Sequence, residues 1–312
     1  MLEKMWERAP LIVGEPIGVL VVAVVVAIIL VRTRRRGETD RPAASHAVRA
    51  GALSVVLVWG LDHLVSRLLV DYPSIAWWAF AVPIAVGAVA LCVRPEPRRP
   101  GTRRTGAPTA VGVRRSWSSF TDPRLLRVAV ALGGVLTITT VCAGLASSPD
   151  EAGRWALLVF GDGGTTSFYG WAYGLPVLLA TALLAGVVGA RLRRIAAPPF
   201  PDAGVADERL RRRAASDAVV SVALGSVALA AGEVFHFLGR VGLGSVGAGI
   251  PGVGDFTWGT PYAAFAGAFE GAGWLLSVAA VVLLLGLAAG TLPPQLFGPR
   301  MPMRPRPETP VR

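Results

Sequence analysis

Long apolar segments dominate this chain and limit what it can fold into. A helix needs about 20 apolar residues to cross the hydrocarbon core of a bilayer, because each residue rises about 1.5 Å and the core is about 30 Å thick. Seven segments come close to this length, at residues 11–31, 50–70, 76–93, 125–146, 171–190, 218–238 and 264–290. The sequence therefore predicts an all-α polytopic membrane helix bundle, with one transmembrane domain over residues 1–290.

The composition supports this class and excludes others. Of the 312 residues, 53% are hydrophobic and only 16% are charged, whereas a soluble domain carries about 25% charged residues. A disordered chain and an ordinary soluble enzyme are therefore poor fits. The two cysteines, Cys92 and Cys142, form no disulfide framework, and we expect them to be small packing residues.

The basic residues predict the orientation of the bundle. Of 31 basic residues only Lys4 is a lysine, and the arginines concentrate in four segments, at residues 32–49, 94–127, 191–216 and 291–312. These segments all fall on one side of an alternating seven-span path. The positive-inside rule makes that side cytoplasmic, with the N-terminus outside and the C-terminus inside. The arginine bias beside abundant Ala, Val and Gly is typical of a GC-rich bacterial gene, so we expect the inner membrane of a bacterium.

Two of the basic segments are also rich in proline. Residues 94–124 form a Pro/Arg-rich loop and residues 291–312 a tail, and neither contains enough apolar residues to form a core. We expect both to be disordered and cytoplasmic, with arginines near anionic lipid headgroups. Because the net charge of +11 sits between membrane spans, we expect no nucleic-acid partner. A membrane protein partner or a second copy of the chain remains open.

The connections on the opposite side have a different character. Residues 147–170 and 240–262 are glycine-rich and contain few basic residues. The dense glycines at 241–254 predict a flexible loop in that stretch. Several aromatic residues lie near the expected membrane interface, where amphipathic rings anchor helices. We predict an aromatic belt formed by Phe160, Phe168, Tyr169, Trp171, Phe256, Trp258 and Tyr262.

The ionisable residues inside the predicted spans carry most of the functional information. Such groups are costly in the membrane unless they are paired or hydrated, so each is a functional candidate. The candidates for ligand or ion binding are Asp62, His63, Arg67, Glu233, His236, Arg240 and Glu270.

Their positions predict one shared pocket. The acidic and histidine positions all fall in the outer half of the bilayer, and nothing comparable occurs in the inner half. Glu233, His236 and Arg240 are spaced i, i+3 and i+7, which places them on one helix face. The motif Gly267-x-x-x-Gly271 predicts a close helix contact beside Glu270. We expect a polar pocket open to the exterior.

Several interpretations of this pocket remain open. The charges can be structural ion pairs of a non-catalytic accessory subunit. They can bind a proton, a cation or, through the arginines, an anion in a transporter or permease. They can hold metal or haem through His63, His236 and Glu233. An embedded hydrolase or transferase using Glu233 and His236 as acid and base is the least favoured. We expect a transporter-like protein without a resident cofactor, and not an enzyme.

Known motifs remove some alternatives. A retinal protein needs a lysine deep in its last helix, and the only lysine is Lys4. The zinc-protease motif His-Glu-x-x-His and the Walker-type phosphate loop are both absent from the sequence.

Overall fold

The computed structural model describes residues 46–69, 76–92, 116–161, 164–198, 205–250 and 254–290. The predicted span at residues 11–31 lies outside the described residues, as does most of the loop at 94–124 and the tail at 291–312. The described helices are α2 (His46–Leu69), α3 (Val82–Cys92), α4 (Pro123–Ala146), α5 (Trp171–Ala196), α6 (Val205–Gly242) and α7 (Ala263–Ala288), with a short 3-10 helix, η1 (Ala79–Ala81), before α3.

Four of the described helices, α4 to α7, are long and apolar enough to cross a membrane. Their most apolar windows have a mean hydropathy of 1.9 to 2.2. The segment Ala79–Cys92 is a shorter apolar helix, and α2 is as long as α4 but carries Arg49, Asp62 and Arg67. The described chain thus has the architecture of a membrane-embedded helical protein.

The helix bounds differ from the predicted spans at two places. Helix α5 continues to Ala196 and α6 begins at Val205, so much of the predicted connection at 191–216 is helical. Helix α3 begins only at Val82, and Pro83 lies in its first turn. Proline is tolerated there because the first N–H groups of a helix have no partner within the helix.

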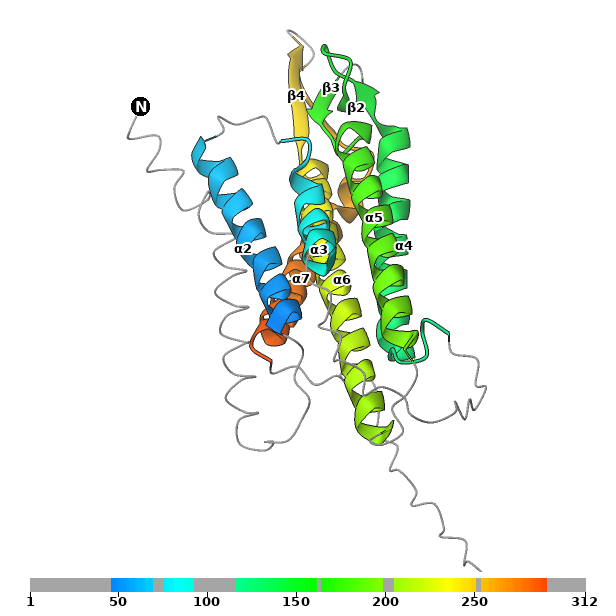
Figure 1. Ribbon diagram of the computed structural model, residues 1–312. Coiled ribbons are helices and arrows are strands. Elements are labelled where there is room, and N and C mark those ends of the chain that lie inside the picture. Colours follow the sequence, from blue (N-terminus) through cyan, green and yellow to red (C-terminus); the bar gives the residue numbers. More distant parts are fainter. Residues whose placement is uncertain are drawn as a thin grey trace, which may run out of the picture.

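Helix α6 forms the centre of the bundle. Its apolar window is 89% buried, against 22% in α4, 22% in α5 and 39% in α7. Every residue from 216 to 232 is buried, and α6 contacts each of the other described helices. A helix that is apolar all round is stable only when other helices enclose it or lipid surrounds it. In this protein the other helices enclose it (Figure 1).

The helices alternate in direction (Figure 1). Helices α2, α4 and α6 begin at one end of the bundle, and α3, α5 and α7 return to it. We name this the arginine end, because Arg124, Arg127, Arg193 and Arg194 lie there. The opposite end carries the β-strands and is named the hairpin end.

Two small antiparallel sheets form the hairpin end. Strands β1 (Ser148–Pro149), β2 (Trp155–Phe160) and β3 (Gly164–Ser167) form one sheet, and β4 (Ser245–Ile250) pairs with β5 (Gly254–Gly259) in the other. The prediction of a flexible loop at 241–254 was therefore wrong, because β4 lies within it. Glycines inside β4 and β5 hide the usual strand signal, because glycine is depleted from strands.

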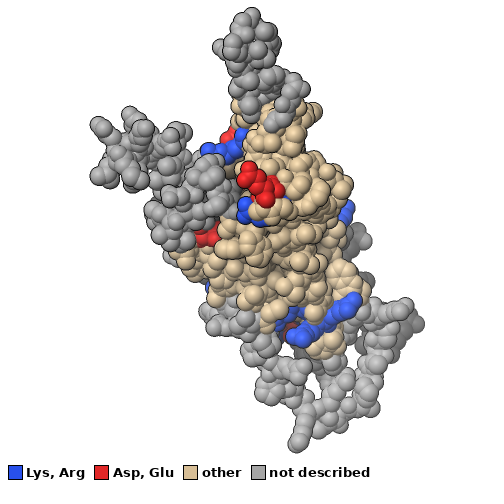
Figure 2. Space-filling model, turned by 90° about the horizontal axis from the view of Figure 1, so that it is seen from above, with Lys and Arg blue, Asp and Glu red and all other residues tan. Residues whose placement is uncertain are grey.

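The surface at the hairpin end carries little charge. Figure 2 views the molecule from above, and most of the described surface in this view is neither acidic nor basic. One charged group at this end stabilises a turn. The Asp150 carboxylate accepts hydrogen bonds from the Ala152 and Arg154 amides. The hydrogen bond from the Arg154 amide is the main cause that lowers the pKa of Asp150 below its usual value.

The two cysteines do not pack the interior. The side chains of Cys92 and Cys142 are both exposed and both free. They were expected to be small packing residues, but neither packs against the described interior. An apolar helix in this bundle presents much of its surface outward, and a cysteine in an apolar run does not reveal which face it occupies.

Helices α6 and α7 pack through glycine. Gly225, Gly232 and Gly239 are seven residues apart on α6, and each lies against α7. A Cβ atom at Gly239 would lie 2.5 Å from the backbone nitrogen of Glu270, and one at Gly273 would lie 2.6 Å from that of His236. Small residues allow this close approach of membrane helices.

The predicted contact through Gly267 and Gly271 is not made with any described residue. A Cβ atom at either position meets no atom of the described part of the chain within 4 Å, and both glycines are exposed. The glycines of α6 that contact α7 instead follow a seven-residue spacing.

We expect Gly239→Ala to lower the stability of the protein and Gly271→Ala not to lower it. Alanine favours a helix over glycine by about 1 kcal/mol, so Gly271→Ala should leave the protein equally stable or slightly more stable. At Gly239 the added methyl group collides with the α7 backbone, and overpacking of this kind costs about 1–3 kcal/mol. The free energy of unfolding in detergent compares the two. Equal effects would contradict the glycine contact.

Candidate functional site

A hydrogen bond joins two of the helices that carry predicted site residues. Trp59 of α2 is almost fully buried, and its indole Nε1–H donates to Oε1 of Glu233 on α6 at 3.2 Å. Glu233 is half-buried, although the positions on α6 before it are fully enclosed. The Glu233 carboxylate therefore lies between α2 and α6. It is more exposed to solvent than the buried residues that precede it on α6.

The other candidates on these two helices lie next to this contact along the chain. Asp62 follows Trp59 by three residues on α2 and is half-buried. His236 is half-buried and Arg240 is exposed, and both lie beyond Glu233 toward the hairpin end. Asp62, Glu233, His236 and Arg240 all make interactions with other groups of the chain.

Helix α7 contributes the last candidate. Glu270 is half-buried, and its backbone packs against Gly239 of α6, directly before Arg240. The close packing of α6 and α7 thus fixes the position at which the Glu270 side chain leaves its helix. The backbones of His63 and Arg67 form part of α2, but their side chains are not among the described ones.

The spacing of these groups decides which kind of ligand they can hold. The described residues contain no group of three or more His, Cys, Asp or Glu side chains arranged to hold a metal ion. What they do contain is a carboxylate with an N–H donor, flanked by further ionisable positions on the same helix face. A carboxylate in such a place can exchange a proton or a cation with water.

We expect Trp59→Phe to destabilise the protein by about 1–3 kcal/mol, because the substitution leaves a Glu233 oxygen without its donor. Trp77→Phe is the matched control, since Trp77 is 58% exposed and makes no contact with Glu233. Unfolding in detergent measures both variants. A double-mutant cycle with Glu233→Ala, which removes the acceptor, then isolates the pairwise coupling. A coupling near zero would show that the hydrogen bond contributes nothing.

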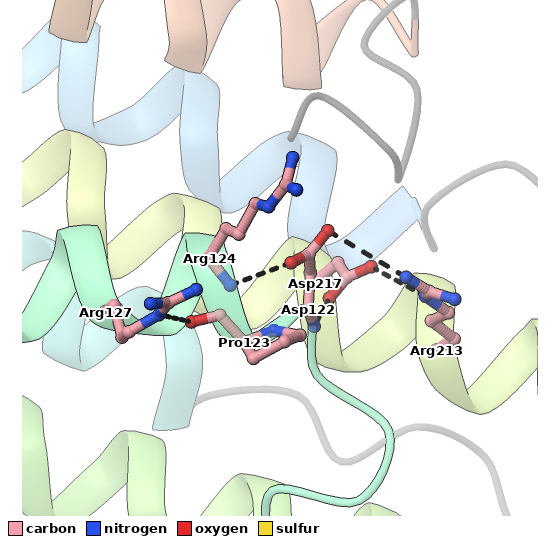
Figure 3. Close-up of polar contacts among 6 residues, drawn as sticks. All are labelled: Asp122, Pro123, Arg124, Arg127, Arg213 and Asp217. Carbon is pink, nitrogen blue, oxygen red and sulfur yellow. Dashed lines mark hydrogen bonds and ion pairs between the residues drawn. The ribbon is translucent and has the colours of Figure 1, made fainter. Parts of the chain in front are cut away.

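A second polar cluster lies at the arginine end (Figure 3). Asp122 caps α4 by accepting a hydrogen bond from the Arg124 amide at 2.8 Å. The amide of Asp122 donates in turn to Oδ1 of Asp217 on α6, also at 2.8 Å. Arg213 approaches both carboxylates, with N···O distances of 3.8 Å to each. The cluster therefore attaches the start of α4 to the central helix.

The sequence patterns predicted no polar cluster at this level of the bundle. Both carboxylates are buried, Asp122 at 4% and Asp217 at 2% exposed. Asp217 falls between the basic segment at 191–216 and the predicted span at 218–238, so it was assigned to neither. A signal for Asp122 was present, because aspartate followed by proline is typical of a helix N-cap and first position.

We expect Asp217→Ala to cost more stability than Asp217→Asn. Alanine leaves the buried Asp122 amide without an acceptor, which costs about 1–3 kcal/mol, whereas the asparagine carbonyl can still accept. The free energies of unfolding of the two variants, measured side by side, test this order. If asparagine proves as damaging as alanine, the ion pair with Arg213 matters more than the hydrogen bond.

The predicted aromatic belt is in part an internal cluster. Phe160, Phe168 and Tyr169 are buried at 6%, 4% and 0% exposure, so these rings do not form a lipid-facing belt. Tyr169 packs edge-on against Phe80, with ring centroids 5.2 Å apart. Its hydroxyl lies 3.2 Å from that of Thr140, and burial raises its pKa.

Tyr262 closes the same end of the bundle from the other side. Its hydroxyl donates to the carbonyl oxygen of Leu238 at 3.1 Å, and burial raises its pKa to about 12. Large exposed rings near this end include Trp77, Trp78, Trp155 and Phe265. Because aromatic residues of both kinds occur in similar sequence surroundings, the sequence did not separate inward from outward rings.

Comparison with known proteins adds no family. The sequence matches no protein-family model and no curated protein, and no solved structure matches the chain. The functional argument therefore depends on the residues and contacts described above.

Proposed function

We propose that this chain is a transporter-like or permease-like membrane protein that binds a proton or a small cation at Glu233. The observation that carries the proposal is the hydrogen bond between Trp59 Nε1 and Glu233 Oε1. It aligns a carboxylate of the central helix with α2, where Asp62 follows one turn later. On this proposal the arginine end faces the cytoplasm, in the inner membrane of a bacterium.

The burial of α6 supports a binding role for Glu233. A carboxylate on a helix of this kind is expensive unless it is paired or hydrated. Glu233 is half-buried, and so are Asp62, His236 and Glu270, all of them in the parts of α2, α6 and α7 nearer the hairpin end. Groups that are only half-buried can exchange protons and ions with water, whereas a fully enclosed pair cannot.

The same contact supports one alternative, a structural role in a non-catalytic accessory subunit. The Trp59 hydrogen bond joins positions that are 174 residues apart in the chain, so it can fix the position of α2 against α6 without binding anything. The two functions make different predictions for Glu233→Gln. A structural carboxylate is needed for assembly, whereas a binding carboxylate is needed for flux.

The test is proton and sodium flux into vesicles that contain the full-length protein. Vesicles loaded with a pH-sensitive dye report proton entry under an imposed potassium diffusion potential, and radioactive sodium reports cation uptake. We expect flux above that of protein-free vesicles, with a loss of roughly tenfold or more in Glu233→Gln, which corresponds to at least about 1.4 kcal/mol of lost binding or barrier stabilisation.

The matched control is Glu151→Gln, which removes an exposed carboxylate in the connection between β1 and β2. It should leave flux unchanged. Absence of proton and sodium flux in folded wild-type protein would overturn the proposal. Glu233→Gln protein that fails to assemble would support the structural alternative.

A further inference from the structure

The outer faces of α4 and α5 form a continuous apolar surface. Only 22% of the apolar window of each helix is buried within the protein. The large side chains that point outward are aliphatic, and they are Val128, Val130, Val135, Ile138, Leu145, Leu175, Leu179 and Leu183. A helix pair of membrane length with such a surface is suited to contact lipid acyl chains.

The register of α4 against α5 brings arginines from both helices to one level. Gly144 lies against the Trp171 ring and Gly174 against Thr140, so the two helices are antiparallel with the end of α4 beside the start of α5. Both helices rise by about 1.5 Å per residue. By this register Arg124, at the start of α4, lies within about 5 Å, along the axis, of the level of Arg193 and Arg194 in the last turn of α5.

The arginines at this end fall into two groups. Some are engaged within the protein: Arg212 is 6% exposed and binds Glu208 and the Pro198 carbonyl, and Arg191 donates to the Leu91 carbonyl at 2.6 Å. Arg193 and Arg194 are exposed, and within the described part of the chain their side chains make no hydrogen bond or ion pair. Arg127 is also exposed and contacts only the Pro123 carbonyl, at 3.2 Å.

We propose that Arg193 and Arg194 bind the phosphate of an anionic phospholipid whose acyl chains lie on the α4–α5 surface. The guanidinium group presents paired N–H donors that match phosphate oxygens. A lipid is the partner that fits, because the positive groups end an apolar face of membrane length. The proposal is independent of any transport activity.

The same arginines have a simpler structural role that the test must separate. They lie in the last turn of α5, where positive charge stabilises a helix by interacting with its negative C-terminal end. A role confined to the helix dipole affects protein stability to the same degree in any lipid. A headgroup site instead changes which lipid stays bound.

The experiment uses full-length protein in nanodiscs with equal amounts of phosphatidylcholine and phosphatidylglycerol. Native mass spectrometry of the released protein measures the ratio of the two lipids that remain bound. We expect wild-type protein to retain phosphatidylglycerol preferentially, and Arg193→Gln with Arg194→Gln to reduce this preference by about fivefold for each arginine replaced.

Two control variants make the result specific. Arg154→Gln removes an exposed arginine at the hairpin end and should retain the wild-type preference. Arg193→Lys with Arg194→Lys keeps both charges and should retain most of it. An unchanged lipid ratio in the folded glutamine variant would overturn the proposal, and so would lower stability without a change in the lipid ratio.

Discussion

The enclosure of α6 by the other helices is the constraint on which the rest of the structure depends. A helix whose residues 216 to 232 are all buried satisfies its own backbone, but a carboxylate that it carries is costly unless a neighbouring group pairs with it. Glu233 accepts from the Trp59 indole on α2, and Asp217 accepts from the Asp122 amide before α4. These two contacts attach the central helix to α2 and to the start of α4.

Glycine residues on α6 allow one neighbouring helix, α7, to pack closely against it. Lipid is as apolar as leucine, so helices in a membrane gain little from hiding aliphatic side chains, and close packing becomes the main source of attraction. Gly232 and Gly239 let α7 approach until backbone meets backbone. Because a methyl group does not fit there, α6 and α7 behave as one unit, and the position of Glu270 relative to Glu233 is set by the backbones.

The sequence predicted the features that follow from length and hydropathy, and it missed those that depend on which face of a helix is buried. The apolar runs located the membrane-length helices, and the cost of charge in a membrane singled out Glu233. Nothing in an apolar run of Ala, Val, Leu and Gly tells an enclosed face from a lipid-facing one, so Gly267 was preferred to Gly239. Asp217 was overlooked because it borders the arginine-rich segment, and β4 because its glycines resemble a flexible loop.

The two polar contacts of α6 lie far apart on the helix, and this limits how the protein can work. Sixteen positions separate Asp217 from Glu233, which corresponds to about 24 Å along the axis and about 160° around it. The two carboxylates therefore face nearly opposite sides, one toward α4 and the other toward α2, and no single polar stripe connects them. Each contact therefore positions a different neighbour of α6, the Trp59 contact α2 and the Asp122 contact the start of α4. Because α7 packs closely onto α6, the position of Glu270 follows that of the central helix.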